Sequence, residues 1–189
     1  MNEKYFVHEN GLCESSDIGE NTRIWAYTHI MKGASIGSNC NVGSHCFIEN
    51  GVIIGNDITI KNGISIWDGV RIDDRVFLGP HMVFTNNLMP RSKAYDYELL
   101  KTRIKYCASI GANATILCGI IIGKYSMIGA GSVITKDVPD YALVYGNPGR
   151  IKGFVCECGE KLEFINSKVT CLKCELTYSI INNECMKEK

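Results

Sequence analysis

A six-residue repeat runs through most of this chain. Large apolar residues occupy every sixth position from residue 12 to residue 84, and the same spacing returns from residue 104 to residue 134. A period of six fits neither an α-helix nor a long alternating strand. It is typical of short strands joined by sharp turns. The positions are Leu12, Ile18, Ile24, Ile30, Ile36, Val42, Ile48, Ile54, Ile60, Ile66, Ile72, Leu78, Phe84, Ile104, Ile110, Ile116, Ile122, Ile128 and Ile134.

The residues around each apolar position support the same interpretation. Glycine often follows it, and a small residue often lies two positions before it, as at Cys40, Cys46 and Ala108. We expect the large residue to fill the interior, the small one to fit a tight corner, and glycine to permit the turn. Three hexads then make one triangular coil, and coils stack at the strand spacing of about 4.8 Å. The pattern predicts an all-β, parallel β-helix of about six coils.

The repeat is interrupted once and then ends. Residues 85–103 are polar, charged and aromatic, so we expect them to loop outward from the coils. Long excursions inside a compact repeat are usually functional or disordered, and the regular flanks favour function here. The prolines at 139 and 148 end the pattern, and a cysteine-rich tail follows. We therefore predict a β-helix domain over residues 1–154 and a separate tail over residues 155–189.

Composition narrows the function classes. Twenty basic residues balance twenty acidic ones, which argues against broad electrostatic binding of nucleic acid or of membranes. No apolar run approaches the roughly 20 residues of a bilayer-spanning helix, and the N-terminus lacks the apolar segment of a signal peptide. Ten cysteines in such a chain favour reduced thiols and metal binding over disulfides. We expect a cytoplasmic protein with neither nucleic acid nor membrane as a partner.

Stacking the hexads predicts a candidate site. His45 and His81 fall in one column two coils apart, which is roughly 10 Å. A second column holds Glu49, Trp67 and Thr85, and the outward loop starts next to it. A lone exterior histidine is ordinarily surface decoration, and a tryptophan can simply cover an apolar patch. The gathering of these groups on one edge of the prism nevertheless favours a substrate pocket.

Five segments carry a resemblance to a known family. NCNVGSHCFIEN (39–50), TIKNGISIWDGV (59–70), VFLGPHMVFTNN (76–87), PRSKAY (90–95) and SIGANATILCG (109–119) resemble the sugar-nucleotide N-acetyltransferases of the hexapeptide acyltransferase superfamily. The resemblance covers about residues 12–150. It is strongest to enzymes that acetylate the 3-amino group of dTDP-3-amino-3,6-dideoxyhexoses, and a related branch acts on UDP-linked 3-amino glucuronic acids.

The resemblance implies a fold, a donor and an assembly. It implies a left-handed parallel β-helix, acetyl-CoA as the co-substrate, and a homotrimer whose active sites lie between neighbouring prisms. It also implies a role in the biosynthesis of surface polysaccharides. Handedness comes from the resemblance alone, because the six-residue period does not show it.

The chemistry assigns roles on the acceptor side. A protonated amine is not a nucleophile, so a base must take its proton during attack on the thioester, and histidine suits this near neutral pH. His45 is the first candidate. Glu49 is expected to orient it or to bind the sugar, and Asn86 to position the amine. His81 stands where relatives more often carry Asn or Ser, and is a secondary, substrate-side candidate. The alternative is proton transfer to the departing CoA sulfur.

Further contacts follow from the resemblance. Trp67, Tyr95 or Tyr97 is expected to stack on the nucleotide base, and Arg91 to meet the pyrophosphate.

The resemblance also implies the donor site. The backbone N–H of Ala112 is expected to stabilise the oxyanion. Gly129 and Ala130 are expected to let pantetheine run close to the backbone. Lys136 and Arg150 are expected to contact the CoA phosphates, and the alternative for each is a solvated surface cation.

The tail carries a second motif. Cys156, Cys158, Cys171 and Cys174 form two close pairs, and such pairs predict a tetrahedral structural zinc in a zinc-ribbon-like hairpin that turns at 166–167. The single residue between the first two cysteines is a tighter spacing than usual, so a degenerate or partly occupied ribbon is the alternative. Cys185 has no assigned role.

Two other functions are alternatives. The gamma-type carbonic anhydrases share the prism, but they need a third histidine where this chain has Asn86. A non-catalytic β-helical assembly subunit would have no acyl-CoA site. The long excursion and the GNPGR segment (146–150) argue against it.

Overall fold

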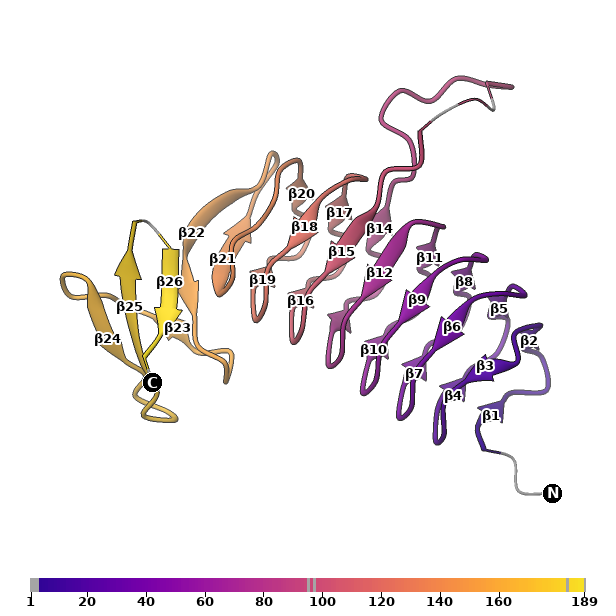
Figure 1. The fold of residues 1–189 in the computed structure, drawn as a ribbon, viewed down its shortest axis with the longest axis horizontal. Coiled ribbons are helices and arrows are strands. Elements are labelled where there is room, and N and C mark those ends of the chain that lie inside the picture. The colour runs from indigo at the N-terminus through magenta and orange to yellow at the C-terminus, as the bar shows by residue number, and fades with distance from the viewer. Residues whose placement is uncertain (1–3, 95, 97, 183, 189) are drawn as a thin grey trace.

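The computed structural model describes residues 4–94, 96, 98–182 and 184–188, and the regular elements in this part of the chain are all strands. Short parallel strands wind into a β-helix with three faces (Figure 1). No helix in the described residues is long and apolar enough to cross a membrane.

The first face is the longest. Its parallel strands are β1 (Phe6–Val7), β4 (Arg23–Ile24), β7 (Asn41–Val42), β10 (Thr59–Ile60), β13 (Phe77–Leu78), β16 (Ser109–Ile110), β19 (Met127–Ile128) and β21 (Ala142–Tyr145).

The other two faces alternate with it along the chain. The second face holds β2 (Leu12–Cys13), β5 (His29–Ile30), β8 (Phe47–Ile48) and β11 (Ser65–Ile66), followed by β14 (Val83–Phe84), β17 (Thr115–Ile116) and β20 (Val133–Ile134). The third face holds β3 (Asp17–Ile18), β6 (Ser35–Ile36), β9 (Ile53–Ile54), β12 (Val70–Ile72), β15 (Thr102–Ile104) and β18 (Ile121–Ile122). Below, edge one joins the first and second faces, edge two the second and third, and edge three the third and first.

The helix has about eight turns, because eight parallel strands stack on the first face. The sequence-based figure of about six was too low. Counting from residue 12 to residue 134 left out β1 at one end and β21 at the other, where the chain keeps coiling beyond Pro139. The first predicted position was also wrong: Leu12 is 53% exposed, and Cys13 pairs with Ile30 in its place.

The interior follows the hexad pattern everywhere else. Ile48 pairs with Ile66 and Ile60 with Leu78, so the same interior position stacks from coil to coil. These side chains are fully buried and form one continuous core cluster. Cys40 and Cys46 are buried at the corners, which confirms them as core filler.

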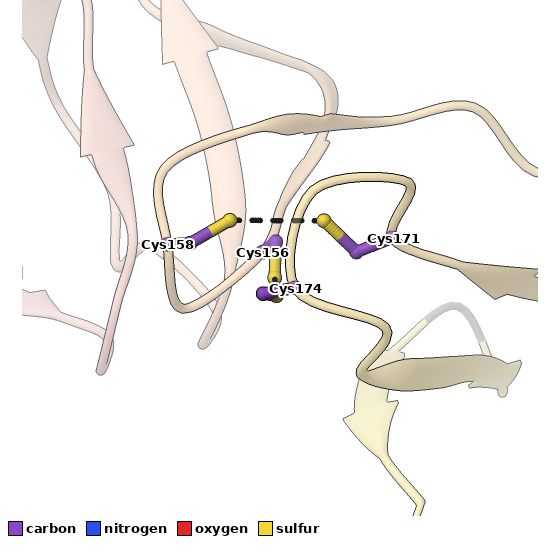
Figure 2. A group of neighbouring side chains, drawn as sticks. All are labelled: Cys156, Cys158, Cys171 and Cys174. Carbon is purple, nitrogen blue, oxygen red and sulfur yellow. Dashed lines mark hydrogen bonds between the residues drawn. The ribbon is translucent and has the colours of Figure 1, made fainter.

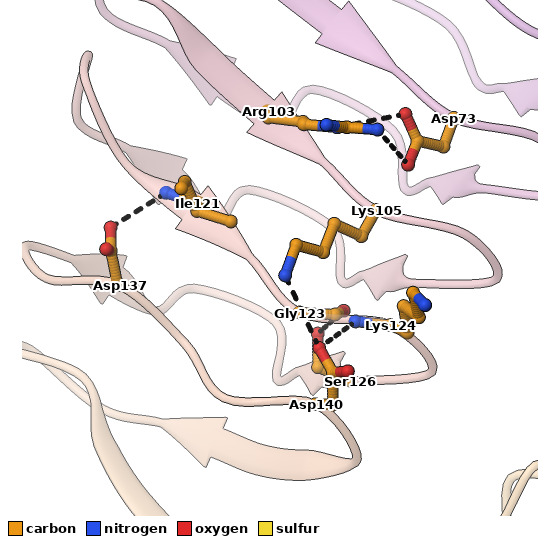
Figure 3. A network of polar contacts seen from close by, with 9 residues as sticks. All are labelled: Asp73, Arg103, Lys105, Ile121, Gly123, Lys124, Ser126, Asp137 and Asp140. Atoms are coloured by element: carbon orange, nitrogen blue, oxygen red, sulfur yellow. Dashed lines mark hydrogen bonds and ion pairs between the residues drawn. The ribbon is translucent and has the colours of Figure 1, made fainter.

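The outward loop leaves the helix between β14 and β15 and projects from its side (Figure 1). It is shorter than the predicted range, because Thr102 and Arg103 already pair with β12 as part of β15. Arg103 forms a two-pronged ion pair with Asp73, with distances of 3.2 and 3.1 Å, and this links the coils on either side of the loop (Figure 3). Further along edge three, Asp140 accepts a hydrogen bond from the Lys124 N–H.

The first part of the tail adds two strands to the sheet of the first face, and the rest forms a separate sheet. Strand β22 (Arg150–Val155) folds back antiparallel onto β21, and β23 (Lys161–Leu162) pairs with β22. A three-stranded sheet follows, made of β24 (Lys168–Thr170), β25 (Thr177–Ile181) and β26 (Glu184–Lys187). The expected turn at 166–167 is present, since Ile165 bridges Lys168 around it, but β23 and β24 belong to different sheets.

Strand β9 offers a direct test of the inside–outside alternation. Ile54 is 2% exposed, whereas its neighbour Ile53 is 50% exposed. Ile54→Ala should lower the free energy of unfolding by about 2–5 kcal/mol, because it leaves a cavity in the stack. Ile53→Ala should cost less than about 1 kcal/mol, as is usual at the surface. Chemical denaturation of the two variants measures the difference, and equal losses would contradict this assignment of the faces.

Candidate active site

The candidate residues lie on two edges of the second face. His45 occupies a corner at edge one, just before β8, and Glu49 follows β8 at edge two. We expected all of them on one edge. The structure separates them because the short strand of the second face lies between the two positions. Glu49 therefore does not orient His45: its Oε2 accepts a hydrogen bond from the Asp68 N–H at 2.8 Å, on the next coil of edge two.

Edge one carries a column of corner residues in the left-handed conformation. Backbone hydrogen bonds link them coil by coil: Gly63 N–H donates to Ser44, His81 N–H to Asn62, and Asn113 N–H to Pro80. Moving along the helix, the column reads Tyr27, His45, Gly63, His81 and Asn113. The predicted alignment of the two histidines is confirmed, with Gly63 between them.

His45 is exposed and stacks on an aromatic ring. Its imidazole lies 4.9 Å from the Tyr27 ring, with an angle of 22° between the planes. Tyr27 was not among the candidates taken from the sequence. The signal was available, because Tyr27 precedes His45 by one full coil of eighteen residues. Tyr27 therefore restricts the orientation of the His45 ring from one side.

The imidazole of His81 fits in its position only because residue 63 is a glycine. A Cβ on Gly63 would lie 2.3 Å from His81 Nδ1, far inside van der Waals contact, and Gly63 itself has φ of +73°. The imidazole of His81 thus packs over the backbone of Gly63, toward the preceding coil. It remains exposed to solvent on its other side.

The side chain of Trp67 at edge two makes contacts within the protein. Its indole Nε1–H donates to the Phe84 carbonyl at 2.8 Å, and its ring packs at 5.7 Å from that of Phe47. This bond sits where the strand pairing of the second face is interrupted between β11 and β14. Trp67 therefore joins the coils at the base of the loop, as well as offering one ring surface to the edge.

The loop contributes two further candidates at edge two. Asn86 is partly buried at the point where the loop begins, beside Thr85, whose hydroxyl accepts a hydrogen bond from Cys118 N–H. Arg91 is exposed and donates to the carbonyl of Pro90. The predicted stacking residues Tyr95 and Tyr97 lie outside the described residues.

Most of the expected CoA contacts line up on edge one. Ala112 lies at the corner after β16, Gly129 and Ala130 at the corner after β19, and Arg150 directly follows the corner after β21. They occupy three successive coils. Lys136 lies apart from them, on edge two after β20.

The Ala112 amide is free to donate. Within the described part of the chain its N–H has no hydrogen-bond acceptor. The preceding coil keeps this amide accessible, since a Cβ on Gly79 would lie only 2.6 Å from the Ala112 nitrogen. An amide of this kind is what an oxyanion needs.

The column sets the distances between these groups. His81 is one coil away from Asn113 and Ala112, but His45 is three coils away, which is about 14 Å at the strand spacing. The structure therefore does not bring His45 and the Ala112 amide to one reacting carbonyl. It brings His81, Asn86 and Ala112 to neighbouring coils.

The four tail cysteines do come together. Their sulfur atoms all lie within 4.8 Å of one another (Figure 2). The Sγ atoms of Cys156 and Cys174 are 3.2 Å apart, and those of Cys158 and Cys171 are 3.6 Å apart.

Comparisons with known proteins agree with the fold. The family model of bacterial transferase hexapeptide repeats matches residues 15–50 and 102–136. The dTDP-3-amino-3,6-dideoxy-α-D-galactopyranose 3-N-acetyltransferase of Aneurinibacillus thermoaerophilus is 59% identical over 169 residues, which span 89% of this chain and 88% of that protein.

More distant relatives share parts of the helix. The galactoside O-acetyltransferase of Lactococcus lactis is 35% identical over 91 residues, 42% of this chain and 44% of that protein. The structure of the BC4754 gene product of Bacillus cereus superposes with a TM-score of 0.57 at 20% identity, covering 82% of this chain and 80% of that one, and so shares the fold.

Proposed function

Because the chain belongs to the hexapeptide-repeat N-acetyltransferases of nucleotide-linked amino sugars, we propose that it transfers the acetyl group of acetyl-CoA to the 3-amino group of dTDP-3-amino-3,6-dideoxy-α-D-galactopyranose. The observation that carries the proposal is 59% identity to an enzyme of that name over nearly the whole chain. The product would serve the biosynthesis of a surface polysaccharide. The acyl donor and the reduced thiols of the tail fit a cytoplasmic enzyme.

The reaction is a direct acyl transfer. The neutral amine attacks the thioester carbonyl, a C–N bond forms, and the carbonyl oxygen becomes an oxyanion that the Ala112 N–H stabilises. The C–S bond then breaks and CoA leaves as the thiolate. The amine loses one proton, either to a histidine or to the departing sulfur.

The positions of the residues along edge one suggest how two substrates share the site. The expected CoA contacts occupy the coils from Ala112 to Arg150, on the C-terminal side of the reaction. A nucleotide sugar that meets the thioester near Ala112 then extends toward the earlier coils. His45 and Glu49 lie there, so we assign them to the nucleotide sugar.

The proton acceptor therefore shifts from His45 to His81. His81 belongs to the coil next to Ala112, and its exposed side chain can turn from Gly63 toward the reacting amine by rotation about its side-chain torsions. His45 is too far along the column to reach an amine attacking at Ala112.

The placement of the site residues on two edges supports a second copy of the chain at each site. His81 and Ala112 lie on edge one, whereas Asn86 and Lys136 lie on edge two of the same face. In a ring of identical chains a contact joins two different surfaces, so edge one of one chain can meet edge two of its neighbour at the same coil height. We therefore include a homotrimer with active sites between chains in the proposal.

A thiol-release assay tests the reaction. With acetyl-CoA, we expect the highest kcat/KM for the dTDP-linked 3-amino-3,6-dideoxygalactose, below it the C4 epimer, and lowest a UDP-linked 3-amino glucuronic acid. The matched control is dTDP-6-deoxygalactose, whose 3-hydroxyl replaces the amine and should release no CoA. A preference for the UDP sugar would contradict the proposed acceptor, and no release with any amine would favour a non-catalytic subunit.

Two matched variants test the proton acceptor. His45 and His81 share the left-handed corner conformation, which Asn tolerates. His81→Asn should lower kcat by about 100-fold or more, the range for a lost general base. His45→Asn should mainly raise KM for the sugar nucleotide, and His8→Asn, at the first coil, serves as the control. A larger loss of kcat in His45→Asn would reverse the assignment, and an unchanged kcat in both would leave the proton to the CoA sulfur.

Light scattering and subunit mixing test the assembly. The mass in solution should be three times the 21.0 kDa of the chain. Mixed after mild dissociation, inactive His81→Asn and Asn86→Ala chains should regain activity, because some sites then combine two intact edges. An active monomer, or no recovery in properly mixed trimers, would contradict a site shared between chains.

A further inference from the structure

Two loops from different sheets meet at the tail cysteines. Cys156 and Cys158 lie just after β22, which is paired to the first face of the helix. Cys171 and Cys174 lie between β24 and β25 of the small sheet. Within the described residues no strand of the small sheet pairs with the first face. The cysteine cluster is therefore a main point of attachment between them (Figure 2).

The spacing of the sulfur atoms matches one shared ion. A tetrahedral zinc site with Zn–S bonds of about 2.3 Å has sulfur atoms about 3.8 Å apart. All four sulfurs here lie within 4.8 Å of one another, and the separations are 3.2 Å between Cys156 and Cys174 and 3.6 Å between Cys158 and Cys171. Disulfides need about 2.05 Å and would bring the sulfurs together only in pairs. The convergence of all four on one point thus favours a metal.

The core around the cluster is too small to hold the tail by itself. Its buried residues are Cys156, Leu162, Cys171, Tyr178 and Cys185. Three of these five are cysteines, and two belong to the cluster. Small units with so little apolar core usually rely on a metal or a disulfide.

One aromatic chain connects this core to the helix. Tyr178 is fully buried, its hydroxyl lies 3.1 Å from Cys156 Sγ, and its ring packs edge-on against Tyr141 at 5.4 Å. Tyr141 in turn stacks on Tyr125 at 5.4 Å along edge three. The cluster therefore lies beyond the last coils on the side of edge three, whereas His81 and Ala112 lie on edge one.

We propose that Cys156, Cys158, Cys171 and Cys174 bind one zinc ion, which fastens the small sheet to the end of the β-helix as a cap. Four thiolates leave no open coordination position, so the ion has no part in acetyl transfer. A stack of repeats exposes its interior at its last coil and needs such a cap. Cys185 stays outside the site, because the sulfur atoms that lie within 4.8 Å of one another are those of the other four cysteines.

Metal analysis of the full-length, freshly reduced protein tests the site. Wild type should contain close to one zinc per chain, and Cys174→Ala should lose nearly all of it. Cys185→Ala removes a buried thiol from the same core and should keep the metal. Wild type that contains no zinc although its four tail cysteines are reduced would overturn the proposal, as would equal loss of metal in the two variants.

A second measurement does not depend on how the variants fold. Cobalt(II) added to metal-free wild type should give the thiolate charge-transfer and tetrahedral d–d absorption of a four-sulfur site at one equivalent. An octahedral spectrum would overturn the assignment. In hydrogen exchange, chelation should expose residues beyond about 155 and the last coil, while coils before the loop stay protected. Uniform exposure, or none, would contradict a cap. None of these readouts involves acetylation, so they stand apart from the proposed reaction.

Discussion

The structure depends on the vertical stacking of identical interior positions. Neighbouring coils exchange backbone hydrogen bonds in both directions, and an isoleucine, valine or leucine of one coil lies directly above its counterpart in the coil before it. Stacking at about 4.8 Å turns sequence separation into distance along the axis. Any two exterior groups are then held at a spacing set by how many coils lie between them. The location of each group in a binding site on such a rod is therefore given by its coil along the axis and by the edge on which it lies.

This explains why much of the fold could be predicted from the sequence. The period of six determined the interior residues, the small corner residues and the alignment of His45 with His81. It could not find the two end strands, because Phe6–Val7 and Ala142–Tyr145 lie outside the uninterrupted run. Leu12 failed for a related reason: at the first coil one residue is skipped, and Cys13 takes the interior place.

The site was predicted less well, and the reason is geometric. Residues four apart on a hexad look adjacent in sequence, yet His45 and Glu49 lie on opposite sides of a face. The hydrogen bonds that these side chains make within the protein could not be predicted either. The indole N–H of Trp67 donates to the Phe84 carbonyl in place of a strand hydrogen bond, and Glu49 accepts a hydrogen bond from a backbone amide. Which residues meet a substrate depends on what their polar atoms already contact, and a period does not encode that.

The same rod geometry explains why the two ends of the molecule differ. Near the N-terminus, strand β1 pairs with β4 in the same parallel register as the rest of the first face. At the other end the last coil is followed by β22, which reverses direction and ends the parallel stack with an antiparallel pair. Parallel stacking could otherwise continue onto another copy, because an exposed strand edge is a template for pairing. The reversed strand β22, with the small sheet attached beyond it, covers the exposed side of this last parallel strand. Because the small sheet packs on the edge-three side of the last coils, through Tyr178 and Tyr141, the edges that carry His81, Ala112 and Asn86 remain available for substrates and for a neighbouring chain.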